Sequence, residues 1–321
     1  MNLQVTIAVI FKPNQKHLET FLSLAATWLD EESELLLAVP DREGINQGGL
    51  LPLFSALPCK ASLIHLASLS NLAGMNQLVQ AAKGEIICFI SPDFLIGPDF
   101  VPRVREFFKE NESLAALGGV PGVLPGKGAW PEVAEAVANF TALSQTFWEP
   151  ELQNAAFRKS ALLNAGGFSD QCADPKGDPY LYEKLEDRGF EIACDHNWPV
   201  RRAHPETLLQ NLLDQFWQAE KWGASKPRGA APWPGMALQS GFVMLGLGLF
   251  ISLWPYDLER ALTLSLVCFM LNYYPNRQFF KFVTEKKPEL MGKSIVFAML
   301  RPFFALPGLF WGSIRRLGLL T

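Results

Sequence analysis

The sequence predicts an α/β fold in which a mostly parallel sheet is flanked by helices and followed by C-terminal membrane helices. Short β-branched apolar runs alternate with segments whose apolar residues recur every three or four positions, a pattern typical of successive strands and helices. An uncharged run of 19 residues, 236–254, is long enough as a helix to cross a hydrocarbon core of about 30 Å. The chain therefore combines a folded domain with a tail of a different character.

The first part of the chain contains four strand-like runs separated by helical patterns. Continuous apolar runs of this length are typical of strands that are buried on both faces of a parallel sheet. We expect strands in QVTIAVIF, ELLLAVP, ASLIHLA and EIICFI. We expect helices in QKHLETFLSLAATWL, in NLAGMNQLVQAAKG, which Gly84 closes, and in GPDFVPRVREFFKENE.

The chain changes character after residue 113, where AALGGVPGVLPGKGAWPE is rich in Gly and Pro and predicts a strand followed by a loop. VAEAVANFTALSQTFW then predicts a helix. NAAFRKSALLNAGGF predicts a short strand that enters a helix ending at Gly166 and Gly167, and DPYLYEKLEDRGFEIACD predicts a helix and a strand. These elements complete an α/β domain over residues 1–225.

Residues 226–321 predict a membrane-associated helical tail. We expect spans at about 236–254 and 259–274, the second of which ends in two tyrosines, as is common at membrane interfaces. The third apolar segment, 294–314, is interrupted by Arg301 and Pro302. A charge at the bilayer centre costs about 2.5–3.5 kcal/mol and proline removes a helical hydrogen bond, so we expect this segment to be re-entrant or interfacial. The alternative is that these segments form the core of a soluble helical domain.

The distribution of charge supports membrane attachment. Residues 1–220 carry 16 Lys and Arg against 28 Asp and Glu, whereas residues 221–321 carry 12 against 4. An acidic body with a basic, apolar tail argues against nucleic-acid binding and favours membrane lipids with anionic headgroups. Most basic residues of the tail flank the two predicted spans, so the positive-inside rule places the soluble domain on the cytoplasmic side of the cell membrane.

Polar residues follow the predicted strands at their carboxyl ends, where open parallel sheets bind their ligands. They are Lys12 and Asn14 after the first strand, then Asp41, Asn71 and Asp93 after the next three. Carboxylates and amides in such positions can hold the ribose or base of a nucleotide. Taken alone, however, Asp41 after Pro40 is equally well explained as a turn residue, and Asp93 in FISPDF is better explained as part of a structural turn.

Several segments, taken in order over about residues 4–225, resemble family 2 glycosyltransferases with the A-type fold. NLAGMNQLVQAAKGEIICFI is similar to the helix and strand that lead to the family's D-x-D motif, and FRKSALLNAGGF is similar to its acceptor-side segment. HPET resembles the region of its late histidine, and QAEKW resembles its Q-x-x-R-W signature. The resemblance implies an inverting, metal-dependent hexosyltransferase that moves sugar from a nucleotide-diphosphate sugar to a lipid-linked or polysaccharide acceptor.

The resemblance also implies roles for individual residues. Asp178 corresponds to the general base that takes the proton of the acceptor hydroxyl. Asp93 corresponds to the last acid of D-x-D, which binds Mn²⁺ or Mg²⁺, and His204 is either a further ligand or a satisfied structural histidine. The implied nucleotide-sugar residues are Asp41, Asn71, Gly74, Asn76, Ser91 and Asp93, and the implied acceptor-side residues are Arg158, Gln218, Lys221 and Trp222. The last three are explained equally well by a helix at the membrane surface.

The sequence departs from the family pattern at two acids. Ser91 stands at the first position of D-x-D, and Gly177 stands at the Glu of the E-D pair. Each change weakens the positioning of the metal or the base. The alternative is therefore a catalytically inactive scaffold, or a nucleotide-sugar-binding module, in a membrane glycan assembly pathway. A nucleotidyltransferase is disfavoured because VIFKPNQK lacks a Gly-rich phosphate loop, and a processive synthase because two spans do not form a channel.

Overall fold

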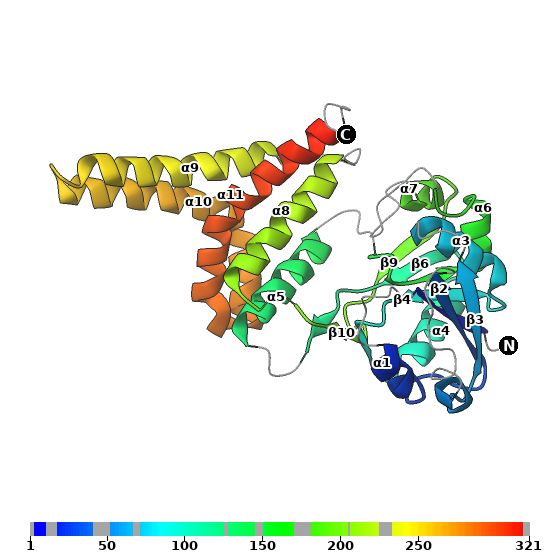
Figure 1. Ribbon diagram of the computed structural model, residues 1–321. Coiled ribbons are helices and arrows are strands. Elements are labelled where there is room, and N and C mark those ends of the chain that lie inside the picture. Colours follow the sequence, from blue (N-terminus) through cyan, green and yellow to red (C-terminus); the bar gives the residue numbers. More distant parts are fainter. Residues whose placement is uncertain are drawn as a thin grey trace. The chain divides into compact units, whose positions relative to one another are not determined.

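The computed structural model describes residues 3–10, 18–40, 52–66, 71–124, 128–144, 150–169, 181–204, 206–224 and 233–316. It divides into two compact units (Figure 1). The first, which we call the sheet unit, comprises Met1–Pro125 and Thr141–Ala203. The second, which we call the helical unit, comprises Gly126–Phe140 and His204–Thr321.

The sheet unit contains ten strands and five helices among its described residues, besides a short helical segment at residues 52–55. The strands are β1 (Val5–Ile10), β2 (Ser33–Pro40), β3 (Lys60–Leu66), β4 (Ile86–Ile90), β5 (Leu95–Ile96), β6 (Leu114–Gly118), β7 (Gly122–Val123), β8 (Asn154–Arg158), β9 (Glu191–Cys194) and β10 (Val200–Arg202). The helices are α1 (Leu18–Ala25), α3 (Asn71–Ala81), α4 (Phe100–Glu110), α6 (Lys159–Asn164) and α7 (Leu181–Glu186).

Seven of these strands form one sheet with the order β3-β2-β1-β4-β8-β6-β9. β8 is antiparallel to both of its neighbours, and every other pair is parallel. Six strands therefore end at the same edge of the sheet, and β8 begins there. The predicted α/β fold with a mostly parallel sheet is confirmed. A second small sheet has the order β5-β10-β7.

Helices cover both faces of the large sheet. Alternate residues of its central strands point to opposite faces, so each face has its own set of buried side chains. Val5, Ile7 and Val9 of β1 pack in one buried cluster with α1 and α4. Ala8 of β1 belongs to the other cluster, which includes α3, α6 and α7. The strands are thus apolar on both faces, which explains the continuous apolar runs in the sequence.

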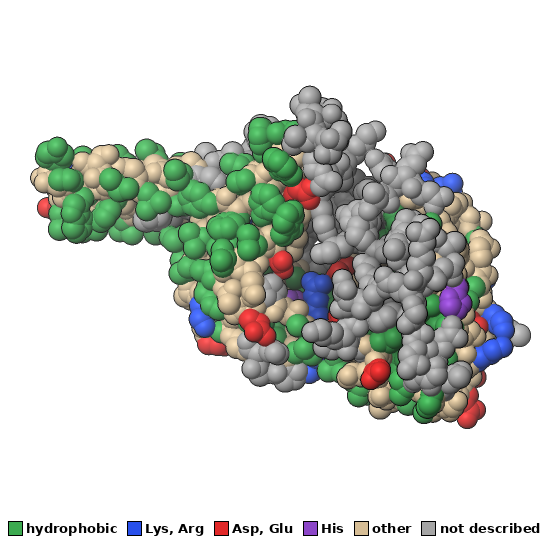
Figure 2. All heavy atoms as spheres, in the orientation of Figure 1, with side chains coloured by type: hydrophobic (Ala, Val, Ile, Leu, Met, Phe, Trp, Pro, Cys, Tyr) green, Lys and Arg blue, Asp and Glu red, His purple; other side chains and the backbone are tan. Residues whose placement is uncertain are grey.

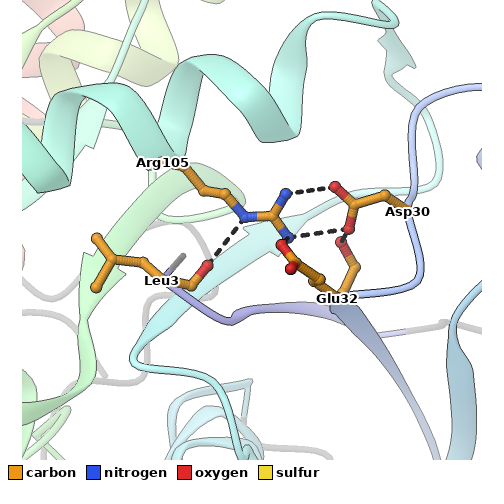
Figure 3. A network of polar contacts seen from close by, with 5 residues as sticks. Leu3, Asp30, Glu32 and Arg105 are labelled. Carbon is orange, nitrogen blue, oxygen red and sulfur yellow. Dashed lines mark hydrogen bonds and ion pairs between the residues drawn. The ribbon is translucent and has the colours of Figure 1, made fainter. Parts of the chain in front are cut away.

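Arg105 of α4 ties together the chain near the amino ends of β1 and β2 (Figure 3). Its Nε donates to the carbonyl oxygen of Leu3 at 2.9 Å, and its two Nη atoms bind the two carboxylate oxygens of Asp30. Glu32 lies 3.9 Å from the same guanidinium. These hydrogen bonds from Arg105 hold the pKa of Asp30 below its ordinary value, although partial burial opposes this.

Two predicted helix ends have different outcomes. α6 ends at Asn164, and Gly166 and Gly167 follow with φ of 84° and 73°, so this prediction is confirmed. α3 ends at Ala81, three residues before Gly84, whose φ is not positive. Gly84 instead lies against β1, because an added Cβ would come within 2.7 Å of the Thr6 amide nitrogen. Its role is close packing.

The helical unit contains residues 129–140 of α5 (Ala129–Ser144), together with α8 (Leu208–Ala224), α9 (Trp233–Leu253), α10 (Leu258–Lys286), the 3-10 helix η1 (Pro288–Leu290) and α11 (Met291–Arg316). Its core joins residues far apart in the sequence, among them Val133, Leu212, Val283 and Phe297. The predicted division at residue 225 therefore differs from the observed one. α8 and the first part of α5 group with the tail because their apolar faces are buried against α10 and α11.

α9 and α10 lie side by side as an antiparallel hairpin that covers both predicted spans, and they extend beyond the other helices of the unit (Figure 1). Hydrophobic side chains cover the visible face of this hairpin (Figure 2). Ile251 is 72% exposed, Leu266 is 62% exposed and Met270 is 61% exposed. Asp257 caps α10 by accepting from the Arg260 amide at 3.0 Å.

The third apolar segment, expected to be re-entrant or interfacial, lies in one continuous helix, α11, and its placement relative to a membrane stays a prediction. The helix runs without interruption through Pro302 and Pro307. It packs on α8 so closely that a Cβ added at Gly308 would lie 2.2 Å from the Phe216 carbonyl oxygen. This packing outweighs the hydrogen bonds that the prolines remove. Pro288–Ile314 is the one described helix long and apolar enough to cross a membrane, and 39% of its apolar window is buried.

Candidate active site

The candidate site lies at the edge of the large sheet where six strands end. Among the described residues, these strands end at Ile10, Pro40, Leu66, Ile90, Gly118 and Cys194. The segments that follow β1, β2 and β3 lie outside the described residues, and with them Lys12, Asn14 and Asp41. The turn after β4 is described in full. This turn contains Ser91 and Asp93 and is therefore the best defined part of the predicted site.

The turn after β4 presents one exposed carboxylate. Ser91 is buried, and its amide donates to the Gln153 carbonyl at 3.1 Å. The Ser91 hydroxyl donates to Oδ2 of Asp93 at 3.3 Å and accepts from the Asp93 amide at 3.4 Å. Asp93 is exposed. The sequence FISPDF thus forms a turn in which a buried hydroxyl supports an outward acid.

Buried polar contacts fix the position of this turn. Asn154, the first residue of β8, pairs with Ile90 in the sheet and is fully buried. Its Nδ2 donates to the Gly119 carbonyl at 2.9 Å, and its Oδ1 accepts from Trp198 Nε1 at 2.8 Å. A Cβ at Gly119 would lie 2.2 Å from the Trp198 Cβ, so only glycine fits there. These contacts therefore hold the end of β4, the end of β6 and the start of β8 together.

A buried ion pair holds the chain after β9 at the same edge. Asp195 is buried and bonds to Nε of Arg103, and its second oxygen accepts from Nη2 of Arg103 at 2.9 Å. The hydrogen bond to Asp195 raises the pKa of Arg103, although desolvation opposes this. Oδ1 of Asp195 also accepts from the Asn197 amide at 2.9 Å.

Neither Asn154 nor Asp195 was predicted as a site residue. A polar residue at the start or end of an apolar strand is the only signal of them in the sequence.

Two residues predicted to approach the nucleotide have described contacts that support the packing of α3. Nδ2 of Asn76 donates to the Phe168 carbonyl at 2.8 Å, and its Oδ1 accepts from the Phe168 amide at 2.8 Å. The side-chain amide of Asn76 therefore fixes the Gly-Gly-Phe turn to α3. A Cβ at Gly74 would lie 2.8 Å from Cδ1 of Leu66, so the glycine lets α3 approach β3. Asn71 begins α3, and its side chain lies outside the described part of the structure.

Arg158 lies at the opposite edge of the sheet. It pairs with Ile86, the first residue of β4, because β8 runs antiparallel to β4. Its guanidinium donates to the carbonyls of Leu114, Phe108 and Asn111 at 2.8–3.0 Å. Burial lowers the pKa of this arginine, although nearby acids oppose the shift. Arg158 therefore supports the fold away from the Ser91–Asp93 turn, and we leave it out of the proposed site.

The remaining predicted residues lie partly outside the described region. Asp178 falls in 170–180, which the structure does not describe. His204 is buried and is the first residue of the second segment of the helical unit. Gln218 is exposed on α8 and accepts from Gln215 Nε2 at 3.4 Å. Lys221 and Trp222 belong to α8, but their side chains are not described.

The described residues contain no group of three or more His, Cys, Asp or Glu side chains that could hold a metal ion. The oxygen atoms of the Ser91–Asp93 turn are nevertheless the donor type that Mn²⁺ and Mg²⁺ prefer. Asp93 fits as one ligand, because its carboxylate is exposed and is supported by the Ser91 hydroxyl at 3.3 Å. The rest of the coordination would come from a bound diphosphate and water.

Comparison with solved structures finds a clear relative in fold. The chain is similar to PcManGT, a mannosyltransferase from Pyrobaculum calidifontis solved in complex with GDP-Man and Mn²⁺. The TM-score is 0.54 at 15% identity, and the match covers 95% of this chain and 88% of that chain. No protein-family model and no curated protein matches the chain. The likeness establishes the fold, so the chain has the fold of a glycosyltransferase, helical unit included.

Proposed function

We propose that the protein is a membrane-attached, inverting glycosyltransferase of the hexosyltransferase class. It moves a sugar from a nucleotide-diphosphate sugar to a lipid-linked or polysaccharide acceptor. The observation that carries this proposal is the exposed Asp93 carboxylate at the end of β4, on the ligand edge of a chain that shares its fold with a mannosyltransferase over nearly its whole length. The GDP-Man and Mn²⁺ bound to that protein motivate a nucleotide-sugar donor and a divalent metal here.

The proposed reaction is a single displacement. The acceptor hydroxyl oxygen attacks the anomeric carbon while the bond from that carbon to the diphosphate oxygen breaks on the opposite face, which inverts the configuration. The proton of the hydroxyl passes to the carboxylate of Asp178, the residue that matches the family's general base. A bound divalent cation would supply electrostatic stabilisation of the negative diphosphate. Asp93 would hold that cation, and Ser91 would orient Asp93.

The other proposed contacts follow the resemblance. Asp41 and Asn71 would bind the ribose or base at the ends of β2 and β3. His204 remains a proposed further metal ligand. Gln218, Lys221 and Trp222 remain proposed acceptor-side residues, with α8 as the element that carries them. Asn76 and Gly74 act through the position of α3, since their described contacts are with Phe168 and Leu66.

Membrane attachment is proposed through the hairpin of α9 and α10, with the sheet unit on the cytoplasmic side. Apolar side chains are exposed along both helices, and the two helices are each other's main partners. Basic residues flank the hairpin, as the positive-inside rule requires of a cytoplasmic side. Exposed tyrosines at 273 and 274, together with Arg277 stacked 4.3 Å from the ring centroid of Tyr274, fit a membrane interface at this level of α10.

A second candidate is a scaffold that binds a nucleotide sugar without turnover. The observation in its favour is Ser91, a neutral residue that the turn uses to support Asp93 where the family has a second acid. With one carboxylate in place of two, the turn offers a divalent cation less negative charge. Binding without catalysis is therefore a specific alternative outcome.

The test separates the two candidates. Membranes that contain the full chain are incubated with a panel of nucleotide-diphosphate sugars and Mn²⁺ or Mg²⁺, and release of the nucleotide diphosphate is measured. We expect Asp178→Asn to lower turnover by about 10²–10⁴-fold, the usual contribution of a general base. Asp187→Asn is the matched control, because Asp187 is exposed in the turn after α7. Asp93→Ala should also lose turnover, and Asp99→Ala, an exposed acid nearby in the sequence, should not. Nucleotide binding without turnover, unchanged by Asp178→Asn, would establish the scaffold instead.

A further inference from the structure

α11 meets α8 along a seam of residues spaced by three and four positions, which places them on one face of the helix. The seam consists of Ser294, Ala298, Arg301, Ala305 and Gly308. Ser294, Ala298 and Ala305 are buried, and Gly308 lies directly against the backbone of α8. A charged side chain thus stands in the middle of a row of small, buried residues.

Arg301 has no partner within the described chain. Its Nε is buried without a hydrogen bond, and the only other described side-chain atom in that state is Oγ of Ser294, seven residues earlier on the same face. Arg301 forms no ion pair or hydrogen bond with any described residue. As a whole the side chain is half-buried, so part of it remains accessible. The guanidinium is therefore placed at the seam with no anionic partner among the described residues.

Two apolar clusters join α8 and α11 on either side of Arg301. Leu212 of α8 packs with Phe297 and Ala298 in one apolar cluster. Ala219 of α8 packs with Ala305 and Leu309 in the next. Arg301 lies between these layers along α11. A charged side chain thus stands between two apolar layers of the seam.

An unpaired guanidinium beside apolar packing is unfavourable unless an anion neutralises it. The planar fork of arginine suits phosphate, because two parallel N–H groups can bind two of its oxygens. α11 also exposes Phe310 and Trp311, and the neighbouring hairpin exposes apolar side chains along its length. We propose that Arg301 binds a phosphate group carried by a membrane lipid. The proposal concerns the helical unit alone and does not rest on glycosyl transfer.

The first experiment measures lipid binding to the full chain in a neutral detergent. Short-chain phosphatidic acid is the probe, and native mass spectrometry measures the bound fraction. We expect the native chain to bind one molecule and Arg301→Gln to bind at least tenfold more weakly. Arg277→Gln is the matched control, because Arg277 is an exposed arginine of α10 that stacks on Tyr274. Equal binding by Arg301→Gln, or equal weakening by Arg277→Gln, would overturn the proposal.

The second experiment measures thermal unfolding of the same proteins. Without lipid, Arg301→Gln and Arg301→Met should unfold at the temperature of the native chain or above it, since they remove an unneutralised charge. With phosphatidic acid, the unfolding temperature should rise for the native chain and for Arg277→Gln, but not for the Arg301 variants. A lower unfolding temperature of both Arg301 variants without lipid would mean a structural partner and contradict the proposal. Inorganic phosphate that protects as well as the lipid would show that the ligand is a free anion, which also contradicts it.

Discussion

The sheet unit and the helical unit differ in how they satisfy buried polar groups. In the sheet unit, Asn154 bonds to Gly119 and Trp198, and Asp195 bonds to Arg103. Thr6 donates to the carboxylate of Glu34, which also accepts from the Lys83 amide. In the helical unit, the described residues include two buried polar atoms without a partner, on Ser294 and Arg301.

The two units also differ in their apolar surfaces. The sheet unit buries its apolar side chains in two clusters, one on each face of the sheet. The helical unit buries a smaller core and exposes large apolar side chains along α9 and α10. A soluble domain rarely exposes a continuous apolar surface of this kind. The difference teaches that exposed apolar surface is concentrated in the helical unit, and we propose that lipid covers it.

Replacing an exposed leucine by aspartate, once in each unit, is expected to give the largest difference between the units. Leu266 of α10 and Leu163 of α6 are both exposed leucines. Leu266→Asp should weaken membrane association by about 2.5–3.5 kcal/mol, the cost of an aspartate at the centre of a span. Leu163→Asp should leave it unchanged. The measurement is flotation of the full chain with liposomes.

The result bears directly on the contrast between the units. If Leu266→Asp floats as the native chain does, α10 does not enter the lipid and the contrast fails. If both variants lose flotation, the loss reflects damage to the protein and not the position of the charge. Unfolding in detergent should be unaffected by Leu266→Asp, because the side chain is exposed there.

Much of the sheet unit could be predicted because its patterns are long. The runs around β1, β2 and β4 are apolar over five or more residues, and the helical spacing of α4 is clear. β5, β7 and β10 have only two or three residues, which is too short for any periodicity. The direction of β8 was not predictable, since the apolar pattern of a strand is the same in either direction. Because β8 runs antiparallel to its neighbours, Arg158 lies at the edge opposite the Ser91–Asp93 turn.

The candidate site could be predicted only in part. The polar turn after β4 follows from the strand pattern and is found at the predicted edge, whereas the roles of Asp41 and Asp178 remain predictions. Asn76 was predicted by resemblance to approach the ligand, but its two bonds to Phe168 depend on a tertiary contact 92 residues away. In the helical unit, Pro302 predicted a break in α11 that packing against α8 overrides. Local patterns cannot anticipate such long-range contacts.

Removing one polar group from each unit sharpens the comparison. Asn154→Ala leaves Trp198 Nε1 and the Gly119 carbonyl unpaired in a buried site, so it should cost about 1–3 kcal/mol of unfolding free energy. Ser294→Ala removes a buried hydroxyl that has no partner, so it should be neutral or stabilising. Urea unfolding of the full chain in detergent measures both. A larger loss in Ser294→Ala than in Asn154→Ala would reverse the contrast.

The smallest expected effect concerns the ion pair of Arg105 and Asp30 in the sheet unit, whose contribution to the unfolding free energy should depend on pH. Arg105→Met removes the guanidinium that binds both oxygens of Asp30, whose side chain is 40% exposed, so the cost at pH 7 should be about 1 kcal/mol. The pKa of Asp30 lies below its ordinary value of 3.8 in the folded chain. Its contribution to stability is therefore present above pH 3.8 and is lost as the pH falls through the folded pKa. The difference between native and variant unfolding free energies should shrink when urea titrations at pH 7 are repeated at pH 3.

Arg188→Met is the control, since Arg188 is exposed and donates to the Lys184 carbonyl. The difference between its unfolding free energy and that of the native chain should not change with pH. A difference for Arg105→Met that stays constant or grows at pH 3 would mean that the arginine acts through Leu3 and packing, and not through the charge of Asp30.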